Sequence, residues 1–248
     1  MQRAWRLIAL GVAAYLLILI TTFPAARVTG MLEERVPDLS IQAVSGSVFS
    51  GQAGRVFWQD LDLGTMHWQF RPVALLLGRF EYRTELTHPA NHGQLTVGMS
   101  LTGRVYAQDL ELVVLPDRVL NHYSPIEITT SGELLLAFEE IDLADMFSNT
   151  TTGRIAWRDA VILEPVNMVL GQLELGVQGS AEALVGEVIE GGELGAFGEV
   201  SLSRDSRYRI ELLLQPGVDV SVETLDLLED AARMQPNGDY LIEQSGQL

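Results

Sequence analysis

The sequence predicts a mainly β protein. We expect an N-terminal transmembrane helix, then a curved, twisted antiparallel β-sheet of trough-like form, and a short helix near the C-terminal end. Three observations predict this fold class. An uninterrupted apolar run occupies residues 7–23, alternating apolar and polar residues broken by glycines follow it, and one short motif recurs about every 50 residues.

The apolar run contains no charged residue between Leu7 and Phe23. At about 1.5 Å per residue it extends roughly 26 Å as a helix, close to the ~30 Å hydrocarbon core of a bilayer. It exceeds the apolar stretch of a signal peptide, about 7–15 residues, so we expect a retained anchor. A buried core helix is disfavoured because the run is apolar on all sides. The anchor residues are Leu7, Leu10, Val12, Leu16, Leu17, Ile20 and Phe23.

The flanking charges predict the orientation of this anchor. Arg3 and Arg6 precede the run and outnumber Arg27, which follows it. Because basic residues are retained on the cytoplasmic side, the domain after the anchor should lie outside the cytoplasm. The expected organisation is a cytoplasmic N-terminus at 1–6, the anchor at 7–23, a juxtamembrane linker at 24–38 and a β-rich domain at 39–248.

Composition excludes several classes of function. The 248 residues carry a formal charge of −17, from 33 acidic and 16 basic side chains, so nucleic acid would be repelled. Lysine is absent, which excludes a P-loop, a Schiff-base lysine and a Ser-x-x-Lys catalyst. Cysteine is absent too, which excludes thiol catalysis, disulfides and zinc sites built on cysteine pairs.

The repeated motif indicates where the sheet bends. GRVFWQDL begins at Gly54, GRVYAQDL at Gly103, GRIAWRDA at Gly153 and a weaker copy, GEVSLSRD, at Gly198. Within a copy the apolar phase slips by one residue at the Gln-Asp or Arg-Asp step. Because strand side chains alternate faces, that slip predicts an extra residue, a β-bulge, at the step. Bulges repeated along a sheet predict a curved trough with one apolar face.

Two helical segments interrupt the predicted strands. Pro72 and Gly78 bracket a short apolar turn, with proline near its start and glycine past its end. Ser221 can cap a helix that runs to about Met234, and a final strand follows at Tyr240–Ile242.

No catalytic, metal or cofactor site is predicted. His88 and His92 have a spacing typical of metal ligands on a helix, but Pro89 lies between them in a turn-like sequence. His67 and His122 lack a nearby serine in an elbow motif. The acidic pairs Asp60 with Asp62 and Glu139 with Glu140 are typical of solvent-facing strand residues. We therefore expect no enzyme.

Trp58, Trp68 and Trp157 lie in the apolar phase of predicted strands, and core packing is the first interpretation. An open apolar trough that holds a lipid tail or a partner's strand is the second, because a half-closed sheet with free edges favours both. The candidate groove residues are Trp58, Leu95, Val97, Leu136 and Trp157.

Three segments resemble a known family: VSGSVFSGQA at 44–53, HWQFRPVALLLGRF at 67–80 and the terminal SGQL. In order and spacing they are similar to the type II secretion system protein N family. Phe49 stands where that family usually has tryptophan. The matching residues are Gly46, Ser47, Gly51, Ala53, Trp68, Pro72, Leu75, Leu76, Gly78, Ser245, Gly246 and Leu248.

The resemblance implies an accessory, non-enzymatic subunit of the type II secretion system. Such a subunit would sit in the cell inner membrane by a single span, with its main domain in the periplasm, and would contact other secretion subunits to support export of folded proteins across the outer membrane. A weaker, architectural similarity to the AsmA-like inner-membrane proteins implies a groove that binds lipid or a hydrophobic segment. Neither implies a cofactor.

Overall fold

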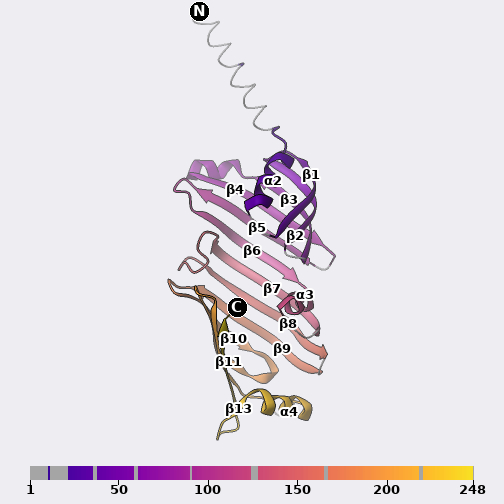
Figure 1. Ribbon diagram of the computed structural model, residues 1–248, viewed down its shortest axis with the longest axis vertical. Coiled ribbons are helices and arrows are strands. Elements are labelled where there is room, and N and C mark those ends of the chain that lie inside the picture. The colour runs from indigo at the N-terminus through magenta and orange to yellow at the C-terminus, as the bar shows by residue number, and fades with distance from the viewer. Residues whose placement is uncertain are drawn as a thin grey trace, which may run out of the picture. The chain divides into compact units, whose positions relative to one another are not determined.

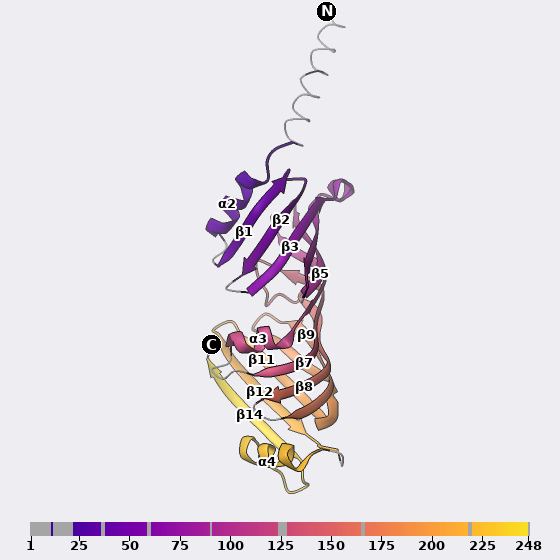
Figure 2. The same ribbon diagram turned by 90° about the vertical axis from the view of Figure 1, so that its right-hand side faces the viewer.

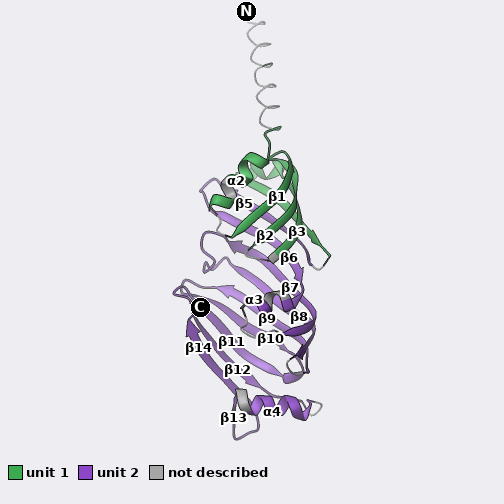
Figure 3. Cartoon of the chain, turned by 45° about the vertical axis from the view of Figure 1, so that its right-hand side comes forward, with its two compact units in different colours: residues 1–89 green, residues 90–248 purple. Residues whose placement is uncertain are grey.

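The computed structural model describes residues 11, 22–35, 38–58, 61–89, 91–123, 128–164, 167–217 and 220–247. The chain divides into two compact units, residues 1–89 and residues 90–248 (Figure 3). The mainly β, antiparallel architecture and the short helix near the C-terminal end are confirmed (Figure 1).

Unit 1 holds four antiparallel strands that lie in chain order. The short 3-10 helix η1 lies between the last two of them, and helix α2 precedes the first. The elements are α2 (Ala26–Arg35), β1 (Leu39–Gly46), β2 (Ser50–Trp58), β3 (Leu61–Phe70), η1 (Pro72–Leu77) and β4 (Arg79–His88).

Unit 2 holds ten strands in chain order, except that β14 lies between β12 and β13. Antiparallel neighbours joined by short turns give this order without crossovers. The strands are β5 (Asn91–Ser100), β6 (Val105–Val114), β7 (Thr129–Asp142), β8 (Thr152–Glu164), β9 (Met168–Gly179), β10 (Ala183–Gly191), β11 (Ala196–Ser203), β12 (Arg207–Leu214), β13 (Arg233–Met234) and β14 (Tyr240–Gln247). The helices are α3 (Pro116–Tyr123), η2 (Gly192–Leu194) and α4 (Val222–Ala231).

The predicted β-bulges occur in two copies of the motif. In β6 the extra residue in the pairing with β5 is Asp109, which has φ +51°. In β8 the extra residue in the pairing with β9 is Asp159, which has φ +48°. Aspartate tolerates this left-handed conformation better than most residues. The step of the first copy, Gln59-Asp60, lies outside the described residues.

The repeat is not a uniform structural unit. Its copies fall in β2, β6, β8 and β11, so similar sequence spacings span different numbers of strands. The difference arises because α3 and the loop after β7 occupy part of the interval between β6 and β8. In the fourth copy the chain turns at Arg204 and Asp205 instead of bulging.

The expected juxtamembrane linker, 24–38, contains helix α2. Glu33 of this helix accepts a hydrogen bond from the backbone N–H of Ile41 on β1, at 2.5 Å. Of the expected anchor, Gly11, Thr22 and Phe23 are described and the other residues lie outside the described part of the chain. No helix within the described ranges has both the length and the apolar character needed to cross a membrane.

Glycines recur opposite aromatic rings on neighbouring strands. A side chain at any of these glycines would overlap the facing ring, so the ring covers the backbone where the glycine leaves space. The pairs are Gly51 with Trp68, Gly98 with Tyr106, Gly153 with Phe138 and Gly246 with Tyr208.

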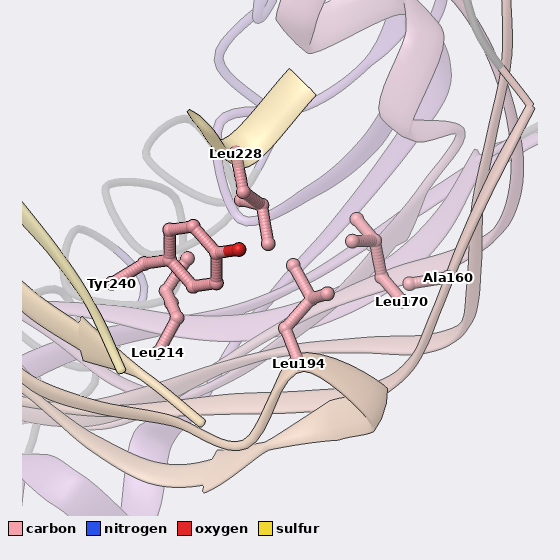
Figure 4. Close-up of a cluster of buried hydrophobic side chains, with 6 residues drawn as sticks. All are labelled: Ala160, Leu170, Leu194, Leu214, Leu228 and Tyr240. Atoms are coloured by element: carbon pink, nitrogen blue, oxygen red, sulfur yellow. The ribbon is translucent and has the colours of Figure 1, made fainter. Parts of the chain in front are cut away.

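A cluster of buried hydrophobic side chains lies in unit 2, where α4 packs against the sheet (Figure 4). Ser221 caps α4 as predicted, and its Oγ accepts a hydrogen bond from the backbone N–H of Thr224 at 3.2 Å. Leu228 of the helix lies against Tyr240 and Leu214 of the sheet. The cluster contains Ala160, Leu170, Leu194, Leu214, Leu228 and Tyr240.

Candidate functional site

The first two motif segments meet at the turn between β1 and β2 in unit 1. Gly46 has φ +90°, a conformation that favours glycine. The indole N–H of Trp68 donates to the carbonyl of Ser47 at 3.1 Å. The ring of Phe49 lies edge-on to that of Phe70, with centroids 5.2 Å apart. Phenylalanine therefore supplies an aromatic contact at the position where tryptophan is usual.

Ala53 and Gly51 explain why this turn packs closely. Ala53 is fully buried between its neighbours on β1 and β3. A Cβ atom at Gly51 would lie 2.5 Å from Cζ2 of Trp68, so only glycine lets the indole lie over the strand. These motif residues fix the position of the turn and offer no reactive group.

The motif segment from Pro72 to Gly78 forms η1 and its cap. Pro72 occupies the first turn, and Gly78 ends the helix at φ +70°. Ala74 is buried, whereas Leu76 is 86% exposed. The predicted helical turn is confirmed, and its apolar side chains mostly face outward.

The terminal motif lies on β14, an outer strand of unit 2. Ser245 pairs with Arg209 and Gly246 with Tyr208, both on β12. The ring of Tyr208 covers Gly246. Leu248 lies outside the described residues.

One face of unit 2 carries a continuous apolar row. Its members are directly opposite one another across five strands, and each is only partly buried. A second row runs beside it through Leu134, Trp157 and Leu173. The first row consists of Leu112, Leu136, Ile155, Leu175 and Val188.

The structure places four of the five candidate groove residues on this face. Leu136 and Trp157 belong to the two rows, and the indole N–H of Trp157 donates to the carbonyl of Ser131 at 3.0 Å. Leu95 and Val97 of β5 share the face, because Gly93 two residues earlier pairs with Leu112. Trp58 lies on β2 in unit 1, where it is 45% exposed. Helix α4 covers the face near Trp157 and Leu173.

The opposite face of unit 2 carries an acidic row that sequence reasoning missed. Four exposed glutamates are directly opposite one another on β10, β11, β12 and β14. Like charges at such positions repel, and Arg209 and Arg233 offset part of this through ion pairs to Glu211 at 3.4 Å and Glu243 at 3.7 Å. The row, Glu187, Glu199, Glu211 and Glu243, becomes visible only once the strand register is known.

A second charged cluster joins the start of β6 to the end of β7. Arg104 donates from Nε to Asp142 Oδ2 at 2.9 Å, from Nη2 to Thr150 Oγ1 at 2.8 Å, and also to Glu140. Gln108 donates to the other oxygen of Glu140 at 2.8 Å. Hydrogen bonding to Arg104 lowers the pKa of Asp142, and hydrogen bonding to Asp142 raises the pKa of Arg104. The cluster ties the start of β6 to β7 and to the loop that follows it.

The three histidines with described side chains do not converge. His67 of β3 and His92 of β5 are exposed, His88 lies 4.0 Å from Asp62, and the side chain of His122 is not described. Within the described ranges, no three histidine, aspartate or glutamate side chains gather closely enough to hold a metal ion.

The acidic pairs can be followed only in part, because one member lies outside the described residues. Asp60 lies outside the described residues, and Asp62 accepts a hydrogen bond from the backbone N–H of Gly64 at 2.8 Å. Glu140 is bound by Arg104 and Gln108, whereas Glu139 is exposed. Among the described residues, the surfaces of the sheet are thus the candidate functional features.

Comparison with known proteins agrees with the resemblance in the sequence. The family model for type II secretion system (T2SS), protein N, matches residues 37–243. Type II secretion system protein N of Vibrio cholerae serotype O1 is 26% identical over 222 residues, which is 85% of each chain. Its counterpart from Aeromonas hydrophila is 26% identical over 220 residues, 86% of each chain. No solved structure matches. Because the family model covers most of its length, this chain belongs to the type II secretion system protein N family.

Proposed function

We propose that this protein is an accessory, non-enzymatic subunit of the type II secretion system. Residues 7–23 anchor it in the inner membrane as a single span, with the N-terminus cytoplasmic and the β-rich units in the periplasm. It supports export of folded proteins across the outer membrane through contacts with other secretion subunits. Family membership carries the proposal, and the charges of Arg3 and Arg6 support the orientation.

The outer edge of β14 is the surface that we propose for these contacts. Strand β12 pairs with the inner edge of β14. In the described part of the chain, β13 pairs with Tyr240 and Leu241 on the outer edge, and no strand pairs with the outer edge of 242–247. Figure 2 shows β14 at the margin of unit 2 with α4 at one end. A free strand edge of this kind readily accepts a strand from another chain.

The outer edge of β1, the first strand of unit 1, is blocked against pairing with another strand. Glu33 of α2 binds the backbone N–H of Ile41, and the backbone N–H of Ala25 donates to the carbonyl of Gly46 at 3.2 Å. Ala43 has φ +54°, which breaks the regular edge of β1. Natural proteins block edges in these ways, and β14 shows no such device among the described residues.

Charge indicates the kind of strand that β14 accepts. Glu243 ends the acidic row at this edge, and Arg233 of β13 approaches it to 3.7 Å. A partner strand that continues from β13 would place a side chain opposite Glu243, where a basic residue is favoured. A second copy of β14 would instead bring further acidic charge to the edge.

Secretion assays with matched variants test this proposal. In cells that lack the protein, we expect less exported protein in the medium, and the unaltered chain should restore export. Glu243→Arg should restore it poorly, because it repels a basic strand. Glu199→Arg makes the same charge change inside the row and should restore it fully. Unchanged export without the protein would contradict the proposed role.

A reporter fusion tests the topology separately. A reporter that is active only in the periplasm, fused after Leu248, should be active. Activity confined to the cytoplasm would contradict the orientation. A processed chain that starts near Arg27 would contradict the retained anchor.

A second candidate function is favoured by the partly exposed apolar row of unit 2. An AsmA-like groove would bind a lipid tail or a hydrophobic segment there. Of these two ligands, the acyl chain of a lipid fits better, because the apolar row has no charged member. The sheet of unit 2 curves around the face that carries this row (Figure 2). The alternative is ordinary core that α4 closes.

Photoreactive phospholipids distinguish these two alternatives. With a diazirine on the acyl tail, labelling of the full chain in vesicles should map to β7–β9. Ile155→Asp should abolish it, because the carboxylate would be buried without a partner. Ala156→Asp places the same charge on the opposite face and is the control. Absence of labelled β7–β9 peptides in the unaltered chain would contradict lipid binding.

A further inference from the structure

Three segments of unit 1 gather at one end of its sheet. The carbonyl of Phe23 accepts a hydrogen bond from the backbone N–H of Val48 at 3.0 Å. The neighbouring carbonyl of Phe49 accepts one from the backbone N–H of Phe70 at 2.7 Å. Helix η1 begins at Pro72, directly after this contact. The last residue of the apolar run and η1 therefore lie at the same end of unit 1, where η1 is the purple coil beside β4 in Figure 1.

Helix η1 exposes its aliphatic side chains. Val73 is 72% exposed, Leu76 is 86% exposed and Leu77 is 75% exposed, while Ala74 faces the sheet and is buried. Scattered exposed leucines are ordinary, but three large aliphatic residues on one six-residue turn form a compact apolar tip. Phe80, which follows the turn on β4, is also 44% exposed.

Two arginines flank the apolar tip. Arg71 Nη1 lies 3.0 Å from Glu81 Oε2, and Arg79 Nη1 lies 3.8 Å from Glu81 Oε1. Glu81 is buried, whereas both arginine side chains remain about half exposed. The buried carboxylate thus holds both guanidinium groups at the base of the tip. Basic side chains beside an aliphatic tip suit the boundary between acyl chains and anionic headgroups.

We propose that η1 is a second membrane contact. Val73, Leu76 and Leu77 insert into the boundary layer of the same bilayer that holds the apolar run, and Arg71 and Arg79 meet lipid phosphates. The position of the proposed anchor identifies the bilayer as the surface that η1 contacts. A bilayer that contains residues 7–23 ends next to Phe23, and therefore next to η1. Apolar side chains of interfacial segments reach about 5–10 Å into this layer, within reach of a single helical turn. The inference rests on the proposed anchor.

Depth-dependent fluorescence tests the contact in the full chain. Because the sequence has no cysteine, Leu76→Cys provides a single site for an environment-sensitive nitrobenzoxadiazole dye. Thr87→Cys is the control, since it is exposed and lies roughly 27 Å further along β4 from Arg79. Both chains are placed in phosphatidylethanolamine and phosphatidylglycerol vesicles that contain lipids with a nitroxide on the acyl chain.

We expect blue-shifted emission and several-fold stronger nitroxide quenching at position 76 than at position 87. Leu77→Asp in the Leu76→Cys chain should return the dye to water, whereas Thr87→Asp should leave it inserted. Near-ultraviolet circular dichroism confirms that each variant is folded. Water-like emission at position 76 in the unaltered background would overturn the proposal. So would a dye that becomes buried only after other membrane proteins are added, because η1 would then contact protein.

Flotation of the same vesicles separates this inference from the anchor on which it rests. If the chain fails to float with the vesicles, the proposed anchor is wrong and the contact fails with it. If the chain floats but the dye at position 76 stays in water, the anchor stands and the second contact alone is overturned.

Discussion

Replacing Arg104 by methionine should destabilise unit 2 through the loss of one charged cluster. The guanidinium binds Asp142, Thr150 and Glu140, which lie on β7 and in the loop after it. Hydrogen bonds to charged groups contribute about 1.5–3 kcal/mol. Because the Arg104 side chain is 38% exposed, solvent screens part of this, and we expect a loss of about 1–2 kcal/mol in the free energy of unfolding.

The pH dependence of this loss identifies the ion pair. Hydrogen bonding to Arg104 lowers the pKa of Asp142 in the folded protein. A carboxyl group with a lowered pKa contributes stability that is fully present above its unfolded pKa, near 4, and is lost as pH falls through the folded pKa. The cost of Arg104→Met should therefore be complete at about pH 7 and should shrink below about pH 4.

Urea unfolding of the full chain in detergent micelles, followed by tryptophan fluorescence, measures both effects. Asp142→Asn and the double variant complete a cycle that isolates the coupling between Arg104 and Asp142. Arg154→Met is the control, because its pair with Glu174 spans 3.5 Å at a mostly exposed side chain and should change stability by less than about 0.5 kcal/mol. A cost for Arg104→Met that stays constant or grows as pH falls would refute the reasoning.

Three further substitutions test the packing. Gly51→Val should destabilise unit 1 by about 1–3 kcal/mol and change the near-ultraviolet circular dichroism, because the new side chain displaces Trp68; an unchanged spectrum would contradict this. Leu228→Ala should cost about 2–4 kcal/mol in urea unfolding and speed amide exchange in α4. Exchange as slow as in the unaltered chain would contradict the role of Leu228 in holding the helix to the sheet. Asp159→Val should lower the free energy of unfolding by about 1–2 kcal/mol, because a β-branched side chain is strained at the φ of +48° that residue 159 adopts. Asp159→Gly should be neutral or stabilising in the same assay, and equal effects of the two variants would argue against the bulge.

Local pattern was sufficient to predict several elements. The phase slip at Arg158-Asp159 predicted a bulge because strand faces alternate strictly, and Ser221 predicted the start of α4 because its hydroxyl caps the first turn. The length of β14 was underestimated, since its polar end has no apolar alternation. Gly246 there is explained only by Tyr208 on the neighbouring strand.

Features that depend on distant contacts could not be predicted. Helix α2 contains Thr29 and Gly30, which are poor helix formers, and Glu33 fixes it to β1 through a tertiary contact. The acidic row and the cluster around Arg104 join residues from separate strands, so only the register reveals them. The unequal strand spacing of the repeats likewise depends on the lengths of the elements between the copies.

Site-specific cross-linking tests the central claim, that the free edge of β14 contacts other secretion subunits. Ser245→Cys carries a benzophenone maleimide in cells that actively export proteins, and Gln42→Cys on the covered edge of β1 is the control. We predict that adducts at 245 contain other type II secretion subunits, that Glu243→Arg reduces them several-fold, and that Glu199→Arg does not. Adducts that contain only unrelated proteins or second copies of the chain, with export intact, would contradict the account.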